Sequence, residues 1–157
     1  EPAPNRSGRD LAQSALAMAR LEGEIAKELD DYNKRPRRKF IGTSAVEYRF
    51  AQYVEDWRLK VERIGTLNYP EAARGKLYGS LVLTVTINSD GTVAGIEINR
   101  SSGHKILDDA ARRIVAMAAP FAAFPPAIRR DTDVLEITRT WNFTQRDSLE
   151  TGKATKR

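Results

Sequence analysis

The sequence predicts an α+β fold in which a small antiparallel three-stranded sheet packs on a helix, in the order ββαβ, after two N-terminal amphipathic helices. Three observations carry this prediction. Residues 81–87 alternate between apolar and polar side chains and lead through Asp90-Gly91, a pair typical of hairpin turns, into a second strand. Small apolar residues recur with helical spacing over 106–118. A third alternating segment follows at 134–143.

The composition is that of one domain with appended segments. The 157 residues are 41% hydrophobic and 30% charged, with a formal net charge of +5 that no segment concentrates. This distribution gives little support for a nucleic-acid partner. The absence of cysteine excludes a disulfide framework, a thiolate metal site and a cysteine nucleophile. No run approaches the roughly 18 apolar residues of a membrane helix. Because the chain starts at Glu1 without Met, we expect a fragment or processed form of a longer protein.

The first part of the chain predicts a leader, a helix and a linker. Residues 1–6 are polar with two prolines and are expected to be disordered. Residues 7–33 predict an amphipathic helix, because apolar side chains recur about every 3.6 positions. This helix either lies at the surface of the main domain, projects into solvent or associates with a second copy of itself. Residues 34–43 predict a basic linker, since five of the six residues from Lys34 to Lys39 are basic. Such a run binds phosphate, anionic lipid or acidic glycan, but it is more typical of a solvated linker.

Residues 44–65 predict a second amphipathic helix, packed on the main domain. Ser44 and Glu47 form an S-x-x-E capping box at its start, and Gly65 suits the position after its last residue. The apolar and aromatic residues between them share one face, which is typical of core packing. These residues are Val46, Phe50, Tyr53, Val54, Trp57, Val61 and Ile64.

Residues 66–143 predict the main domain. Pro70 holds Tyr69 extended and begins a short helix, and the first strand and its hairpin follow. The apolar parity of the return strand shifts, which predicts a bulge near Gly95. Pro120 ends the helix that comes next. In the last strand Arg139 is the odd member of a face that is otherwise apolar, and residues 144–157 predict a polar tail.

The polar residues do not assemble a reaction centre. The single histidine, His104, follows Ser101-Ser102, but no carboxylate is placed to orient it. Asp108 and Asp109 point about 100° apart on a helix, so they cannot chelate one ion together. The glycines do not have the spacing of a phosphate loop. We therefore expect no catalytic residue, no metal ion and no cofactor.

The open edges of the sheet remain as the candidate binding surface, because an edge strand has unpaired backbone N–H and C=O groups. The last strand carries Glu136, Thr138, Thr140 and Asn142 on its polar face. Such an edge can accept an extended peptide through main-chain pairing.

The order and spacing of the motifs between Tyr69 and Phe143 resemble the TonB C-terminal domain family. The pattern reads Y-P-x-x-A-R, G, alternating V/L, D-G-x-V, S-S-G-x-x-x-L-D-x-A-A and F-P-P. The matching residues are Tyr69, Pro70, Ala73, Arg74, Gly79, Asp90, Gly91, Val93, Ser101, Ser102, Gly103, Leu107, Asp108, Ala110, Ala111, Phe124, Pro125 and Pro126.

The resemblance implies the periplasmic domain of an inner-membrane-anchored energy transducer. Its expected partners are TonB-dependent outer-membrane transporters and, through an anchor ahead of Glu1, the ExbB–ExbD proton motor. Siderophore and iron uptake is the implied process. The transporter's "TonB box" peptide would be bound by β-strand addition. By carry-over, the peptide-binding residues are Leu67, Asn68, Tyr69, Pro70, Leu135, Glu136, Ile137, Thr138, Arg139, Thr140, Trp141, Asn142 and Phe143.

Two alternatives stay open beside this one. The first is a nucleic-acid binding domain that uses Lys34 to Lys39 with Arg129-Arg130, although we expect no nucleic-acid partner. The second is a homodimer built by exchange of sheet edges. Salt dependence separates nucleic-acid binding from strand pairing, because phosphate neutralisation is lost as salt rises.

Overall fold

The structure is a computed structural model, and it describes residues 8–42 and 47–152. The chain forms two compact units, Glu1–Pro36 and Arg37–Arg157. The leader expected at 1–6, and Ser44 and Val46 of the second predicted helix, lie outside the described residues.

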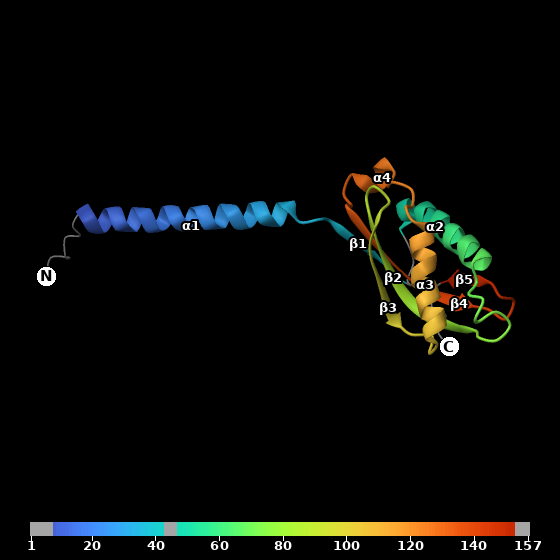
Figure 1. Cartoon of the computed structure of the whole chain (residues 1–157). Helices are drawn as coiled ribbons and strands as arrows, with labels where there is room; N and C mark the ends of the chain where they lie inside the picture. The colour runs from blue at the N-terminus through green and yellow to red at the C-terminus, as the bar shows by residue number, and fades with distance from the viewer. Residues whose placement is uncertain (1–7, 43–46, 153–157) are drawn as a thin grey trace. The chain divides into compact units, whose positions relative to one another are not determined.

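The first unit contains the helix α1 (Gly8–Lys34), which spans nearly all of the segment expected at 7–33 (Figure 1). Small residues, mainly alanine, and unbranched long ones favour a helix here. No residue of α1 is buried. Its apolar side chains are therefore exposed, at Leu11, Leu16, Met18, Leu21, Ile25, Leu29 and Tyr32.

The second unit is built on a mixed sheet with five strands in its described residues, β1 (Arg38–Ile41), β2 (Gly79–Asn88), β3 (Val93–Arg100), β4 (Val134–Phe143) and β5 (Leu149–Gly152). The spatial order is β1-β4-β2-β3, and β5 also pairs with β4. β1 runs parallel to β4, whereas the other pairs are antiparallel.

The expected antiparallel sheet of three strands is thus correct for β2, β3 and β4 but incomplete. β1 lies in the segment expected to be a basic linker, and β5 lies where a polar tail was expected. Both have only four residues. A strand this short shows too few alternations to be recognised from periodicity alone.

Two helices, α2 (Tyr48–Leu67) and α3 (Lys105–Ala118), cover one face of the sheet (Figure 1). A third, α4 (Pro126–Arg129), is a single turn. The core lies between the helices and the inward face of β2 and β4, as the alternation of those strands requires. Its fully buried large side chains include Phe50, Leu81, Leu83, Ile87, Leu107, Ile114, Ile128, Leu135, Ile137, Trp141, Phe143 and Leu149.

The β2–β3 hairpin has the predicted turn and bulge. Gly91 has a φ of 90°, which favours glycine. A Cβ at Gly91 would also collide with the carbonyl oxygen of Phe121, whose N–H donates to the Gly91 carbonyl at 2.8 Å. Thr86 pairs with Gly95 and Ile87 with Val93, which leaves Ala94 as the extra residue of a bulge.

The end of α2 differs from the prediction. The helix continues past Gly65 to Leu67 and is capped by Asn68. The backbone N–H of Asn68 and its Nδ2 both donate to the Ile64 carbonyl, at 3.0 and 2.8 Å. The side-chain amide thus supplies the cap that was assigned to the glycine.

Candidate functional site

The outer edge of β4 is occupied by the chain's own short strands. β1 pairs with residues 134–137 and β5 pairs with residues 140–143. Among the described residues, only Thr138 and Arg139 of β4 have no strand opposite them on this edge. The expectation that β4 is a free edge is therefore wrong, because exposed backbone donors and acceptors are covered here by two added strands.

β5 is held against the C-terminal part of α2. The N–H of Leu149 donates to Thr66 Oγ1 at 3.1 Å, and that of Thr151 donates to Glu62 Oε1 at 3.2 Å. The Leu149 side chain is 2% exposed. A Cβ at Gly65 would clash with Leu149 Cδ2, so glycine is what lets the strand approach the helix.

The Tyr69-Pro70 turn lies beside the hairpin that joins β4 to β5. The rings of Tyr69 and Phe143 meet edge to face with centroids 5.6 Å apart. The N–H of Gly75 donates to Asp147 Oδ1 at 3.0 Å. The two separate parts of the predicted peptide site therefore meet at this end of β4.

Tyr69 supports the turn rather than presenting its ring to a partner. It is 2% exposed, and its hydroxyl donates to the Leu77 carbonyl at 2.7 Å. Burial raises the pKa of its phenol. Leu67, in contrast, is 73% exposed and borders an open groove between this turn and α3. Pro70 lines the same groove, with Ile106 and Met117 opposite.

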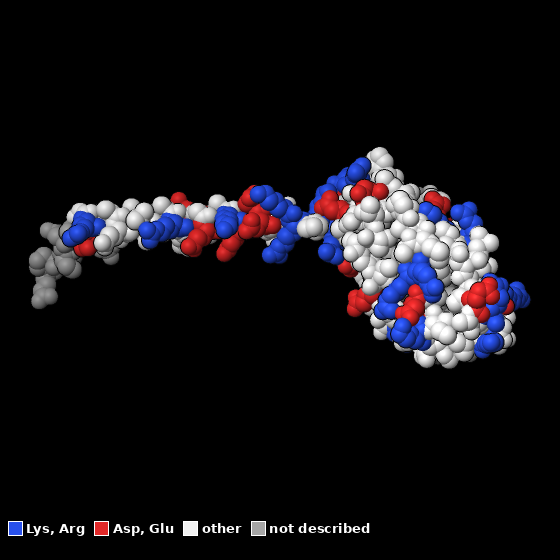
Figure 2. All heavy atoms as spheres, in the orientation of Figure 1, with Lys and Arg blue, Asp and Glu red and all other residues white. Residues whose placement is uncertain are grey.

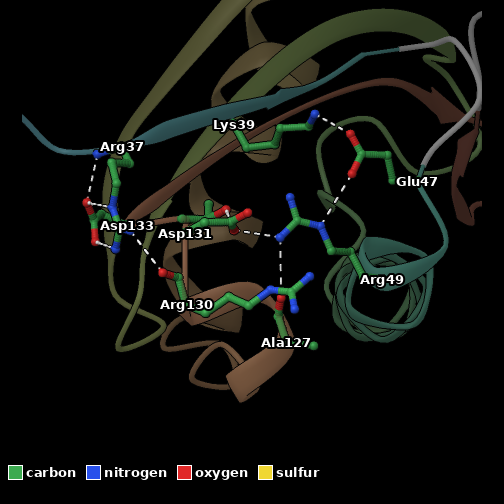
Figure 3. A network of polar contacts seen from close by, with 9 residues as sticks. Arg37, Lys39, Glu47, Arg49, Ala127, Arg130, Asp131 and Asp133 are labelled. Carbon is green, nitrogen blue, oxygen red and sulfur yellow. Dashed lines mark hydrogen bonds and ion pairs between the residues drawn. The ribbon is translucent and has the colours of Figure 1, made fainter.

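β1 is fixed by a network of ion pairs that Figure 3 shows from close by. Nε and Nη2 of Arg37 each donate a hydrogen bond of 3.0 Å to the Asp133 carboxylate, and the backbone N–H of Arg37 donates to the same carboxylate at 2.7 Å. These hydrogen bonds from the side chain and backbone of Arg37 lower the pKa of Asp133 to about 2. Lys39 pairs with Glu47 at 2.5 Å.

A second part of the network ties the start of α2 to the loop before β4. Arg49 lies 3.3 Å from Glu47 and 2.5 Å from Asp131, and its Nη1 donates to the Ala127 carbonyl at 3.3 Å. Hydrogen bonds from Lys39 and then Arg49 lower the pKa of Glu47. The β1 end of the β4 edge is thus cross-linked by charge-assisted bonds.

Arg139 lies in the gap between β1 and β5. It is 4% exposed, and its Nη1 donates to the Gly42 carbonyl at 2.8 Å. Burial lowers the pKa of its guanidinium, and the charge of Arg58 adds to this effect. The sequence singles out this residue as a break in an apolar face, but it does not show that the side chain is buried.

The remaining predicted site residues fall into three classes of exposure. Leu135, Ile137, Thr140, Trp141 and Phe143 are buried, Pro70, Glu136, Thr138 and Asn142 are half-buried, and Leu67 and Asn68 are exposed. The polar face of β4 bonds to β2, with Thr138 Oγ1 lying 2.7 Å from Thr84 Oγ1. Glu136 pairs with Arg38 of β1 at 2.8 Å.

Sequence reasoning missed Gly65, Thr66 and Leu149, which together hold β5. The only signal for them was a single leucine in an otherwise polar tail. In the described part of the chain, no group of three His, Cys, Asp or Glu is arranged to hold a metal ion. None of the helices described there combines the length and apolar character needed to cross a membrane.

A family model matches the chain in comparison with known proteins. The model of the family described as the Gram-negative bacterial TonB protein C-terminal matches residues 66–144, half of the chain. No curated protein and no solved structure matches the chain. The match confirms the resemblance carried by the motifs between Tyr69 and Phe143.

Proposed function

The chain belongs to the family of Gram-negative bacterial TonB protein C-terminal domains, and on this premise we propose that β4 binds the TonB-box peptide of an outer-membrane transporter by strand addition. The family is a non-enzymatic, transport-associated one whose general role is TonB-type energy transduction in the periplasm. It interacts with outer-membrane transporters in general. The peptide-binding residues are those carried over above, Leu67 to Pro70 and Leu135 to Phe143.

One observation carries the proposal: the edge of β4 is covered by two four-residue strands rather than by a long one. A peptide gains main-chain bonds with β4 only where a covering strand leaves. β1 is cross-linked through Arg37, Lys39 and their carboxylate partners, whereas two N–H donors of β5 bond to side chains of α2. We therefore assign β5 as the strand that the peptide replaces.

Replacement of β5 also explains the predicted contact with the Tyr69-Pro70 turn. A peptide paired with residues 140–143 would lie against Thr66 and Gly65, next to Leu67. An apolar side chain of the peptide would fill the space over Gly65 that Leu149 occupies when β5 is bound. The peptide binds only molecules in which β5 has left β4. The measured affinity is therefore lower than the intrinsic affinity of the open edge, in proportion to the fraction of molecules that are open.

Strand addition suits force transmission. A strand pulled along its length loads its main-chain bonds together, so a contact below about 1,200 Å² and of modest affinity can still transmit force. In this proposal the force comes from the ExbB–ExbD motor through an inner-membrane anchor, and the transporter cargo is siderophore-bound iron. The chain would then act as the periplasmic link.

The test is a titration of peptides from transporter N-termini into the isotope-labelled full chain, followed by amide shifts. We expect shifts at Leu67 to Tyr69, at the β5 amides and over 138–143, the part of Leu135 to Phe143 that β1 does not cover. Shifts that avoid these residues, or none at saturating peptide, would contradict the proposal.

Two variants sharpen this test. Leu149→Ala weakens β5 and should raise the apparent peptide affinity several-fold, because more molecules have an open edge. Ile98→Ala is the matched control, since it removes a partly buried core contact of β3 without touching β5. Equal affinities in the two variants would argue against replacement of β5.

Self-association through α1 is a second proposed role, favoured by its exposed apolar side chains. Residues 8–20 hold two basic and one acidic residue, whereas residues 22–31 hold five acidic and one basic. An antiparallel pair of helices places these unlike halves together, and a parallel pair does not. We therefore propose an antiparallel homodimer of α1.

The surface offers less support for nucleic-acid binding. On the face that Figure 2 shows, Lys and Arg lie interspersed with Asp and Glu. Arg37, Arg38 and Lys39 of the basic run are engaged with Asp133, Glu136 and Glu47. Binding of a DNA or RNA oligonucleotide that falls steeply with salt would favour this alternative.

A further inference from the structure

Two side-chain acceptors of α2 lie along β5 with matching spacing. Thr66 Oγ1 accepts the N–H of Leu149 at 3.1 Å, and Glu62 Oε1 accepts the N–H of Thr151 at 3.2 Å. Four residues of a helix rise about 6 Å, and two residues of a strand rise about 7 Å. Acceptors four positions apart on α2 can therefore meet alternate N–H groups on the outer side of a strand that pairs with β4.

Glu62 is oriented for this contact before any partner arrives. Arg58, one turn earlier on α2, donates through Nη1 to Glu62 Oε2, which leaves Oε1 for the strand. Arg58 is itself fixed by two hydrogen bonds to Glu55. The Glu62 side chain is 18% exposed, and a hydrogen bond to a carboxylate is stronger than one to a neutral oxygen. α2 thus presents a preorganised acceptor to the backbone of whichever strand occupies the edge.

β5 fills this site imperfectly at Thr151. This residue is 4% exposed and lies opposite Trp141, which is fully buried. Within the described part of the chain, neither Thr151 Oγ1 nor Trp141 Nε1 has a hydrogen-bond partner. A buried hydroxyl without a partner is costly, whereas an apolar group of the same shape avoids that cost. Valine has the shape of threonine, so a strand with valine in this place would pair with β4 more favourably than β5 does.

We propose that Glu62 and Thr66 are specificity residues of the β4 edge, because they accept two alternate backbone N–H groups of the strand bound there. The partner peptide has an apolar residue in the place of Leu149 and valine in the place of Thr151. It displaces β5 because it keeps both contacts with α2 and lacks the buried hydroxyl. Proline, which has no N–H, is excluded from both places. The inference rests on the proposed function, since it names features of the peptide bound there.

The first experiment tests the buried hydroxyl without an added peptide. Thr151→Val in the full chain should slow hydrogen exchange of the Leu149 amide about tenfold, because β5 then pairs more favourably. Thr151→Ser is the matched control, since it keeps the hydroxyl and loses a methyl group. It should not slow this exchange.

The same measurement tests the acceptors of α2. Glu62→Ala should speed exchange of the Thr151 amide about tenfold, the usual effect of losing a hydrogen bond to a charged group. Glu62→Gln keeps a side-chain carbonyl oxygen and should speed it less. Thr66→Val should speed exchange of the Leu149 amide, and Thr66→Ser should not. Glu55→Gln is the control, since Glu55 is an exposed carboxylate that pairs within α2.

The second experiment measures peptide binding to the isotope-labelled full chain carrying Leu149→Ala. The peptides copy residues 147–152, DSLETG, with Thr, Val or Asn in the fifth place. Asn offers an acceptor to Trp141 Nε1. We expect the Val peptide to bind about tenfold more tightly than the Thr peptide. An ester in place of the fifth amide removes its N–H and should weaken the Val peptide about tenfold, and Glu62→Ala in the receptor should abolish this difference.

The outcomes separate this inference from the proposed function. The inference is overturned, and strand addition stands, if the Val and Thr peptides bind equally, if the Asn peptide binds most tightly, or if the cost of the ester persists in Glu62→Ala. If transporter peptides fail to shift the β4 amides but the cost of the ester depends on Glu62, the proposed function fails and recognition by α2 stands. If no short peptide binds, the exchange rates decide. Rates that are unchanged in Thr151→Val, or in Glu62→Ala, overturn the inference.

Discussion

Single residues decide which strands cover β4. Arg37 and Asp133 fix β1 through a two-bond fork and a backbone donor, while Gly65 gives β5 room to lie against α2. Arg139 places a buried cation on β4 between the segments that pair with β1 and β5. Each of these roles depends on one side chain, so each is testable by one substitution.

The Arg37–Asp133 pair makes the attachment of β1 sensitive to acid. Asp133 has a pKa of about 2 in the folded chain against an ordinary value of 3.8. Its contribution to stability is therefore present above about pH 4 and is lost as the pH falls through about 2. We expect Asp133→Asn to lower the free energy of unfolding at neutral pH, with a difference from wild type that shrinks toward pH 2.

Urea unfolding at a series of pH values measures this difference. Glu97→Gln is the control, since Glu97 is an exposed carboxylate of β3. An Asp133→Asn effect that stays constant from neutral pH to pH 2 would contradict the assignment.

Gly65→Ala should loosen β5. Its Cβ would collide with the Leu149 side chain, and such overpacking costs about 1–3 kcal/mol. We expect faster exchange of the Leu149 and Thr151 amides and a lower free energy of unfolding. Gly152→Ala, where no atom lies within 4 Å of the added Cβ, should leave both nearly unchanged.

A double variant tests the cause. Leu149→Ala removes Cδ2 and Cγ, the nearest and third-nearest of the three close atoms, and keeps Cβ at 2.9 Å, so the cost of Gly65→Ala should be smaller in that background than in wild type. Additive costs would mean that the two residues act independently.

At the scale of elements, the short strands contrast with the long helix. β1 and β5 each depend on bonds with β4 and with neighbouring side chains. α1 has 27 residues and no buried one, so packing within its own unit does not stabilise it. An isolated helix of this kind gains stability when its apolar stripe is covered by a second copy.

Leu21 lies near the middle of α1 and is 57% exposed, so it would lie near the centre of an antiparallel pair. We expect sedimentation equilibrium to report a dimer of the full chain, and Leu21→Glu to shift it toward monomer by at least tenfold in the dissociation constant. Gln13→Glu, a change to an equally acidic residue off the apolar stripe, is the control. A wild-type chain that is monomeric at high concentration would refute the pairing.

The whole molecule divides at Pro36. The second unit holds the entire core, and its first strand begins at Arg38. These facts predict that the unit spanning 37–157 unfolds cooperatively by itself.

Two truncations test this division. We expect a chain starting at Arg37 to keep the thermal midpoint of the full chain. A chain starting at Thr43 should melt several degrees lower, because it lacks β1 and the Arg37–Asp133 pair. The prediction fails if both truncations melt alike.

The sequence by itself determined the central elements of this protein. Alternation over 81–87, the Asp90-Gly91 turn, the helix ended by Pro120 and the final long strand are local patterns. They were sufficient to identify β2, β3, α3 and β4, the bulge near Gly95 and the family. Local patterns report these features because side-chain periodicity follows directly from backbone geometry.

Only the tertiary structure decided what lies along the edge of β4. β1 is about 96 residues from its partner strand, and the Arg37–Asp133 bond has that separation. β5 is a strand because Leu149 meets Gly65 and Thr66 of α2, a contact that periodicity does not encode. The burial of Arg139 follows from the same packing. The cover of the β4 edge and the burial of Arg139 arise from segments that are far apart in the sequence and meet only in the folded chain.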